Sequence, residues 1–210
     1  KSVEKIRQSL EFAAAGAQRL ALGAALPIAE SIAGRLAALP GVEAVTPAGS
    51  LRRGKDTIGD IDILVCARDG GPVCAAFCSM PEVEQVLASG DKKASVRLSL
   101  AKFGGRGDGA VQVDLRVLPR ASYGAALMYF TGSKEHNVAL RERALKVGLT
   151  LNEYGLFPND DEPTPPQSRG VAPVAAETEE GIYAALRLPY IPPEMREARG
   201  ELDLKATPPL

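Results

Sequence analysis

A hydrophobic segment that carries two carboxylates constrains the fold of this chain more than any other feature. Within residues 60–67, Asp60 and Asp62 lie two positions apart, so in a β-strand they share one face while the apolar residues between and after them face a core. Two carboxylates on one face repel each other, and divalent cations held by hard oxygen ligands commonly offset that repulsion. The segment therefore predicts a buried strand with a metal-binding carboxylate pair.

A third aspartate lies on another segment with strand periodicity. Apolar and polar residues alternate over 111–117, which places Asp114 on the polar face of a strand that forms a hairpin with residues 96–100. Considered alone, Asp114 favours a salt bridge to Arg116 or Arg97. Considered with the first two aspartates, it favours a site in which three carboxylates hold two Mg²⁺ or Mn²⁺ ions beside substrate phosphates.

A glycine-serine turn precedes the acidic strand. Gly49 and Ser50 would present backbone N–H groups and a hydroxyl at the start of a short helix, an arrangement that binds anionic oxygens. Arg53 follows closely and can donate two hydrogen bonds to one phosphate group. An ordinary helix cap explains Ser50 equally well when it is taken alone. Together these residues predict a binding site for a triphosphate.

The remaining periodicity predicts helices and short strands. Pro27 is expected to kink the first helix or to divide it, and Ser133 can cap a later one. Residues 83–87 fit a strand or a helix equally well. Helices are expected over residues 3–39, 72–79, 122–130, 133–147 and 178–188, a strand over 42–48, a turn over 104–109 and a Pro- and Asp-rich loop over 158–173.

Composition narrows the class of protein. The 210 residues carry a formal net charge of −1 and contain no run long enough to span a bilayer. The chain begins at Lys1 rather than at methionine, so we expect a fragment of a longer protein. Three cysteines, Cys66, Cys74 and Cys78, indicate a reducing compartment, and no histidine lies near enough in sequence to predict a zinc site with them. The single histidine, His136, is interpreted as a polar helix residue.

Two motifs together resemble a known family. The sequence Gly-Ser-Leu-Arg-Arg-Gly over 49–54, followed by Gly-Asp-Ile-Asp over 59–62, is similar to the palm of the X-family DNA polymerases, relatives of DNA polymerase beta. This first motif also occurs across the wider nucleotidyltransferase superfamily. The sequence Tyr-Phe-Thr-Gly-Ser over 129–133, with Asn137 and Arg141 downstream, is more specific to the family. The resemblance covers roughly residues 20 to 200, and the ending looks like that of bacterial members.

The resemblance implies an α+β fold. It implies a nucleotidyltransferase palm with a mixed β-sheet and backing helices, followed by a smaller C-terminal α+β thumb subdomain. Residues 1–40 would form the helical end of a fingers-like region, residues 41–125 the palm, and residues 126–210 the thumb-like subdomain that binds the nascent base pair.

The resemblance also implies a role for each residue that matches a motif. The acids would bind the metal ions, the turn would hold the triphosphate, the aromatic bend would contact sugar and base, and two arginines would contact DNA. In that order, the residues are Asp60, Asp62 and Asp114; Gly49, Ser50, Arg53 and Gly59; Tyr129, Phe130, Gly132 and Asn137; and Arg116 and Arg141.

Two positions depart from the family's pattern. Gln112 stands where animal relatives carry an arginine beside the third aspartate, so the contacts expected there are altered. Lys134 replaces an acidic residue that packs on the incoming base, so base contacts at that point are expected to differ.

The expected activity is template-directed addition of deoxynucleotides to a primer 3′-end with two divalent metal ions, Mg²⁺ or Mn²⁺, in short-gap filling during DNA repair. DNA and a dNTP would be its partners, without a membrane, and the protein would be a cytoplasmic, nucleoid-associated monomer. Two alternatives stay open. One is an untemplated nucleotidyltransferase acting on RNA ends or a small molecule, and the other is a non-catalytic DNA-binding module.

Overall fold

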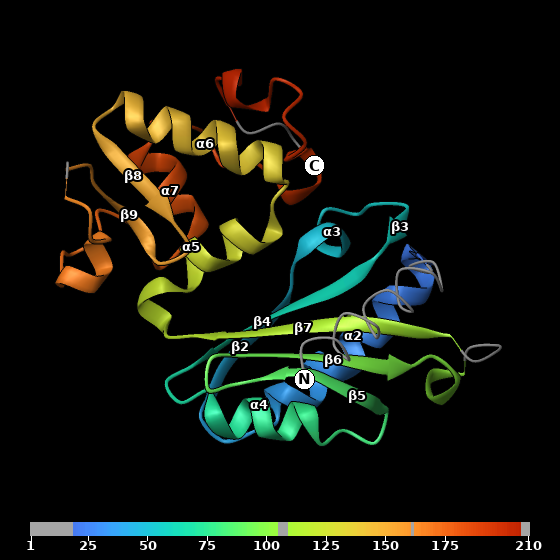
Figure 1. The fold of residues 1–210 in the computed structure, drawn as a ribbon. Coiled ribbons are helices and arrows are strands. Elements are labelled where there is room, and N and C mark those ends of the chain that lie inside the picture. Colours follow the sequence, from blue (N-terminus) through green and yellow to red (C-terminus); the bar gives the residue numbers. More distant parts are fainter. Residues whose placement is uncertain (1–18, 105–108, 161, 207–210) are drawn as a thin grey trace, which may run out of the picture.

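The computed structural model describes residues 19–104, 109–160 and 162–206, and is built on a five-stranded mixed sheet (Figure 1). Its strand order is β2–β4–β7–β6–β5, in which β4 and β7 run parallel and every other neighbouring pair is antiparallel. This architecture confirms the predicted α+β class with a mixed sheet. The strands are β2 (Val42–Pro47), β4 (Asp60–Ala67), β5 (Val83–Ser89), β6 (Lys93–Ser99) and β7 (Ala110–Leu118).

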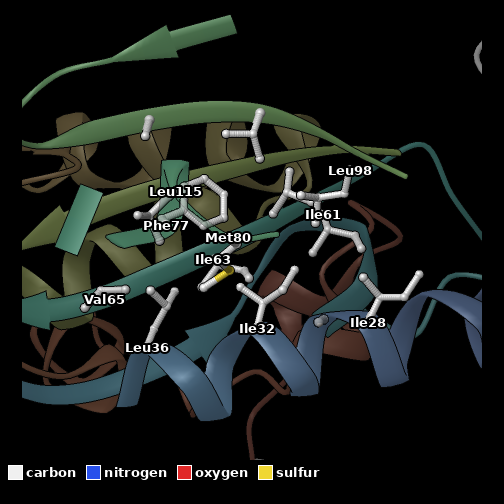
Figure 2. Packing of buried hydrophobic residues seen from close by; sticks show 14 of the residues in the cluster. Ile28, Ile32, Leu36, Ile61, Ile63, Val65, Phe77, Met80, Leu98 and Leu115 are labelled. Atoms are coloured by element: carbon white, nitrogen blue, oxygen red, sulfur yellow. The ribbon is translucent and has the colours of Figure 1, made fainter. Parts of the chain in front are cut away.

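Two helices, α2 (Leu22–Ala37) and α4 (Gly71–Cys78), cover one face of this sheet (Figure 1). The predicted apolar stripe of Ile28, Ile32 and Leu36 is buried and faces the apolar side chains of β4 (Figure 2). Residues four apart lie on one side of a helix, so the stripe meets a sheet face whose side chains project at every second position. This packing fixes which face of β4 is left for its carboxylates.

The first helix is shorter than predicted. It begins at Leu22 because β1 (Leu20–Ala21) is extended and pairs with β3 (Thr57–Ile58), the short strand just before the acidic one. The helix continues through Pro27 without dividing. Residues 3–18 of the predicted helix lie outside the described residues, as do residues 105–108 of the predicted turn.

Residues 83–87, which the sequence left undecided, form the edge strand β5. Its side chains are almost all exposed, so neither a helical nor a strand periodicity of burial exists to be detected in the sequence. Pairing with β6, rather than local preference, decides its conformation.

The C-terminal part of the chain forms a second hydrophobic cluster of its own. It lies across the sheet from α2 and α4 (Figure 1). None of the helices within the described residues is long and apolar enough to cross a membrane. The elements of this subdomain are α5 (Arg120–Thr131), α6 (Lys134–Lys146), β8 (Leu149–Asn152), β9 (Gly155–Pro158), α7 (Glu179–Ala185) and three short 3₁₀ turns at Pro166–Arg169, Pro193–Met195 and Glu201–Asp203.

The start of α6 is fixed by polar contacts. Ser133 caps the helix as predicted, since its hydroxyl accepts a hydrogen bond from the His136 backbone N–H at 3.2 Å. The His136 ring is fully buried, with Nδ1 2.6 Å from Glu201 and Nε2 2.9 Å from the Tyr183 hydroxyl. Burial lowers the pKa of His136, although the neighbouring Glu201 opposes that shift. His136 therefore joins α6 to the C-terminal segment.

Helix α5 covers only part of the second face of β4. Leu64 and Cys66 are buried there beneath Tyr123 and Ala126 of this helix. The strand is therefore covered on both faces over its second half. The carboxylates lie in its first half, before this cover begins, which leaves their face of the sheet open.

A buried ionic network ties the subdomain to the sheet. Arg52 of α3 (Gly49–Arg52) donates to both carboxylate oxygens of Glu179, at 2.8 and 2.7 Å, and to the Thr131 hydroxyl at 2.7 Å. The fully buried Arg196 donates to Glu179 at 2.6 Å. Burial raises the pKa of Glu179, but the two arginines outweigh this effect and hold it below the ordinary range. Glu179 is therefore an ionised, paired charge between the two parts of the molecule.

Removal of this charge should destabilise the protein. Glu179→Ala leaves two arginines without their buried partner, and breaking such a network costs about 3 kcal/mol. Asp160→Ala, which breaks the exposed pair with Arg169, should destabilise the protein far less, because water screens that pair, and serves as the control. Chemical denaturation of both variants measures the difference.

The same network predicts an acid-dependent stability. The pKa of Glu179 is lower in the folded than in the unfolded chain, so its stabilisation is present at neutral pH and is lost as the pH falls through the folded-state pKa. The stability gap between wild type and Glu179→Ala should thus narrow in acid. A gap that stays constant between neutral pH and acid would contradict this assignment.

Candidate active site

The parallel pairing of β4 with β7 brings the predicted acids together. Asp62 is the register partner of Asp114, and Asp60 is the partner of Gln112. Register partners on adjacent strands project from the same sheet face. Gln112 donates through Nε2 to Asp114 Oδ2 at 3.0 Å, so the residue that departs from the family's arginine contacts the third acid directly.

The carboxylates influence one another electrostatically. Burial raises the pKa of Asp62 to about 7, together with the charges of Asp60 and Asp114 and against those of Arg116 and Arg53. Burial and the charge of Asp114 also raise the pKa of Asp60. Mutual repulsion at this strength is typical of a site that accommodates positive charge from outside the chain.

The donor set fits a hard divalent cation. The three side chains offer only carboxylate oxygens, which Mg²⁺ and Mn²⁺ prefer, and Arg116 and Arg53 offset only part of their repulsion. Among residues 19–104, 109–160 and 162–206, no three acidic, histidine or cysteine side chains already converge closely enough to enclose a metal ion. Oxygen ligands from outside the chain, such as water or phosphate, would complete the coordination of a cation there.

The glycine-serine turn packs directly against the acids. Gly49 has a positive φ of 60°, and a Cβ atom there would lie 2.1 Å from Asp62 Oδ2, so only glycine permits this approach. The Ala48 N–H donates to the Asp62 carbonyl at 2.8 Å and joins the turn to the strand. The turn predicted to bind phosphate therefore borders the carboxylates.

Arg53 extends from this turn toward the C-terminal subdomain. Its Nε donates to Glu197 Oε1 at 2.8 Å, and its Nη1 donates to the Thr131 carbonyl at 2.5 Å. Lys55 lies 3.4 Å from the same Glu197 oxygen. The guanidinium expected to bind a triphosphate thus has a carboxylate partner in this structure.

Tyr129 and Phe130, at the end of α5, form the wall of the site on the side of the C-terminal subdomain. The Tyr129 side chain is 39% exposed, and its ring meets that of Phe130 edge-on at 5.1 Å. Asn137 donates through Nδ2 to the Tyr129 carbonyl at 2.7 Å. The Arg116 guanidinium lies over the Phe130 ring at 4.7 Å. Burial in the hydrophobic core is the alternative role for these aromatics. Tyr129 does not fit it, because its side chain is partly exposed.

These groups line one hollow of about 520 Å³ between the sheet and the C-terminal subdomain. Asp114 lies beside it through its register with Asp62, Gly59 directly precedes Asp60, and Arg116 lines a neighbouring hollow with Phe130. The lining residues are Gly49, Ser50, Arg53, Asp60, Asp62, Tyr129, Phe130, Thr131, Gly132, Lys134, Asn137 and Arg141.

Sequence reasoning missed the residues that position this wall. Glu179 follows the cap residue Thr178, so in sequence it is an ordinary acidic residue of a first helical turn. Gly124 of α5 allows the contact, since a Cβ there would lie 2.3 Å from Thr178 Cα. Nothing in the local sequence indicates that Arg52 reaches Glu179, which lies 127 positions away.

Carboxylates on two adjacent interior strands, a glycine-serine turn beside them and an aromatic wall from the C-terminal subdomain define the class of protein as a nucleotidyltransferase palm with a thumb-like subdomain. Comparison with known proteins agrees. A family model described as DNA polymerase beta palm matches residues 27–102, and one described as DNA polymerase beta thumb matches residues 126–197.

Individual relatives narrow the family. The chain is 33% identical to "DNA polymerase/3'-5' exonuclease PolX" of Bacillus subtilis (strain 168) over 203 residues, which cover 97% of this chain and 33% of that protein. It is 30% identical to "DNA polymerase lambda" of Rattus norvegicus over 163 residues, covering 71% of this chain and 28% of the relative. The chain spans about a third of the length of these relatives. It belongs to the X family of DNA polymerases and comprises palm and thumb regions of that family.

The repulsion among the acids predicts a stabilising substitution. Asp62→Asn removes one of the mutually repelling charges, so in the absence of divalent cations it should raise the free energy of unfolding by about 1–2 kcal/mol. The raised folded-state pKa of Asp62 means that wild type loses stability as the pH rises through about 7. The advantage of the variant should therefore be larger at alkaline than at acidic pH.

Thermal unfolding with and without Mg²⁺ or Mn²⁺ provides the measurement. Added cations should stabilise wild type and have little effect on Asp62→Asn. Asp56→Asn, at an exposed position six residues earlier, is the matched control and should behave as wild type. Equal stabilisation of wild type and Asp62→Asn by the cations would remove Asp62 from the metal site.

Proposed function

We propose that this chain is the nucleotide-adding core of a template-directed DNA polymerase, which extends a primer 3′-end and releases pyrophosphate. The observation that supports this most directly is the single hollow that holds the carboxylate pair, the glycine-serine turn and the Tyr-Phe-Thr-Gly bend. The names of the relatives, all of them DNA polymerases, support the same activity.

The acids would form the metal site of this reaction. Asp60 and Asp62 would hold both divalent cations, and Asp114 would hold the one beside the primer 3′-hydroxyl. When bound, these ions would supply positive charge to the attacking and leaving oxygens. Gln112 holds the Asp114 carboxylate by a hydrogen bond and so orients it.

The walls of the hollow would position the nucleotide. Gly49, Ser50 and Gly59 would bind the triphosphate with Arg53, through backbone N–H groups, a hydroxyl and a guanidinium. Tyr129, Phe130 and Gly132 would pack against the sugar and disfavour ribose, and Asn137 would meet the minor-groove edge of the incoming base. Positioning and electrostatics of this kind account for most of the catalysis in phosphoryl transfer.

Arg116 and Arg141 would contact the DNA strands. Contacts of arginine with phosphates supply affinity without sequence preference, as a gap-filling enzyme requires. Short-gap filling in repair, by a monomer in the cytoplasm at the nucleoid, is the setting we propose. The template strand would approach Arg141, which lines the hollow, and the primer strand would approach Arg116, which lies on the central strand β7 and lines a neighbouring hollow.

Extension of a gapped duplex tests the activity. Wild type should add the templated nucleotide with Mg²⁺ or Mn²⁺, whereas Asp114→Ala should retain less than about 1% of the rate, because loss of one metal-binding acid removes several kcal/mol of transition-state stabilisation. Asp56→Ala is the control and should extend at the wild-type rate.

The alternatives predict different products. An untemplated nucleotidyltransferase would add nucleotides without regard to the template base, and a non-catalytic DNA-binding module would bind the duplex without extending it. Addition of all four dNTPs at equal rates opposite one template base would replace the proposed activity by the first alternative. Metal-dependent dNTP binding would exclude the second.

A second experiment concerns the sugar wall. Tyr129→Ala removes the half-exposed ring beside which the sugar would lie, so discrimination between dNTP and rNTP should fall by about tenfold, from a loss of roughly 1.4 kcal/mol. Competition assays with one dNTP and its ribonucleotide measure the ratio. Leu145→Ala, at an exposed position of α6, should leave the ratio unchanged, and an unchanged ratio in Tyr129→Ala would remove this role.

A further inference from the structure

Arg53 lies between two anionic environments, only one of which the proposed function uses. Its side chain lines the hollow with Gly49 and Ser50, where a triphosphate would bind. The same guanidinium forms an ion pair with Glu197 at 2.8 Å. One guanidinium has a limited set of donors in a fixed fork, so a phosphate and this carboxylate would compete for it.

Glu197 is presented to Arg53 by a rigid segment. The preceding residue, Arg196, is fully buried and donates a hydrogen bond to Glu179. The Arg196 carbonyl accepts a hydrogen bond from the Ser133 N–H at 2.9 Å. Its successor Ala198 donates its N–H to Glu201 at 2.8 Å. Because both neighbours are anchored, the Glu197 carboxylate is held at Arg53 with little loss of conformational entropy.

The carboxylate is ionised at neutral pH. Burial raises the pKa of Glu197, but the hydrogen bond and charge of Arg53, together with Lys55, outweigh this effect and hold it below the ordinary range. Lys55 lies 3.4 Å from the same oxygen. Arg53 and Lys55, the two positively charged side chains beside the turn, therefore share the negative charge of Glu197.

We propose that Glu197 is a built-in competitor of the incoming triphosphate, which occupies Arg53 in the absence of nucleotide and must release it when the phosphates bind. This inference rests on the proposed function of the hollow. Glu197 thereby sets the affinity for the nucleotide. Since it belongs to the C-terminal subdomain and Arg53 to the sheet side, phosphate binding would also break one contact between the two.

The neighbouring contact explains why the two parts would stay joined. Arg52 binds Glu179 through two hydrogen bonds, and the Glu179 side chain is only 4% exposed. The Glu197 side chain is 21% exposed and uses one oxygen for both cations. The Arg53–Glu197 pair is partly accessible to water, which weakens its attraction, whereas Glu179 is buried with two arginines, so breaking that network leaves uncompensated charges away from water. Of the two ion pairs, Arg53–Glu197 is therefore the one that a phosphate would replace.

Glu197→Gln tests the competition, because it removes the charge and keeps the size of the side chain. The 210-residue chain, bound to a gapped duplex with a dideoxy-terminated primer and Mg²⁺, should bind a dNTP about three- to tenfold more tightly than wild type. Inorganic tripolyphosphate should show the same gain, because the competition concerns the phosphates alone. In primer extension KM should fall by a similar factor while kcat changes by less than about twofold.

Two controls separate competition from a general effect of charge or folding. Glu194→Gln removes an exposed carboxylate three residues earlier in the same segment and should leave affinity for both probes unchanged. In an Arg53→Ala background, Glu197→Gln should no longer increase tripolyphosphate affinity, because the contested guanidinium is gone. A purely structural Glu197 would instead lower the melting temperature and leave both affinities unchanged.

The outcomes are decisive in both directions. Unchanged or weaker binding of tripolyphosphate by folded Glu197→Gln would overturn the inference, as would an equal gain in the Arg53→Ala background. If Glu197→Gln does not fold at the assay temperature, Glu197→Asp, which keeps the charge but shortens its reach, should show the same gain at smaller size. Failure of wild type to extend primers would overturn the proposed function, while tripolyphosphate binding would still decide the competition.

Discussion

The parallel pairing of β4 with β7 is the constraint on which the site depends. It places Asp62 opposite Asp114, although the two strands are separated in sequence by α4 and the β5–β6 hairpin. The side chains on the other face of β4 lock this register, because a slip by one residue would turn the apolar face outward and the carboxylates inward. The repulsion among the acids is thus maintained by the hydrophobic core beneath them.

A second constraint comes from adjacent arginines that have different tasks. Arg52 is committed to the buried Glu179 and holds the C-terminal subdomain against the sheet. Arg53, one position later, faces the hollow and contacts the more exposed Glu197. The fold therefore places a buried contact and a more accessible one on adjacent residues. Under the proposed competition, the opposing wall would stay in place while Arg53 exchanged Glu197 for a phosphate.

Sequence periodicity predicted the elements that are amphipathic and missed those that are not. The strand over 60–67 is observed with those bounds, because it is an apolar run that alternates with the acids in its first half and is buried on both faces in its second. The edge strand β5 could not be assigned, because its exposed side chains carry no pattern. The first helix was predicted too long, since pairing of Leu20–Ala21 with β3 overrides local helix preference. The sequence motifs named most of the residues that line the hollow, whereas Glu197 and Glu179, whose partners are distant in sequence, were not predicted.

The amino-acid sequence by itself determined the chemical groups of the site and the face on which each lies, because strand and helix periods are local properties of the chain. It could equally determine that Gly49 precedes the acids, but not that its missing side chain makes room for Asp62. Only the tertiary structure decided which acid meets which arginine. Those pairings join residues more than a hundred positions apart, and the burial that makes such a charge pair strong or exchangeable exists only after both parts of the chain have packed together.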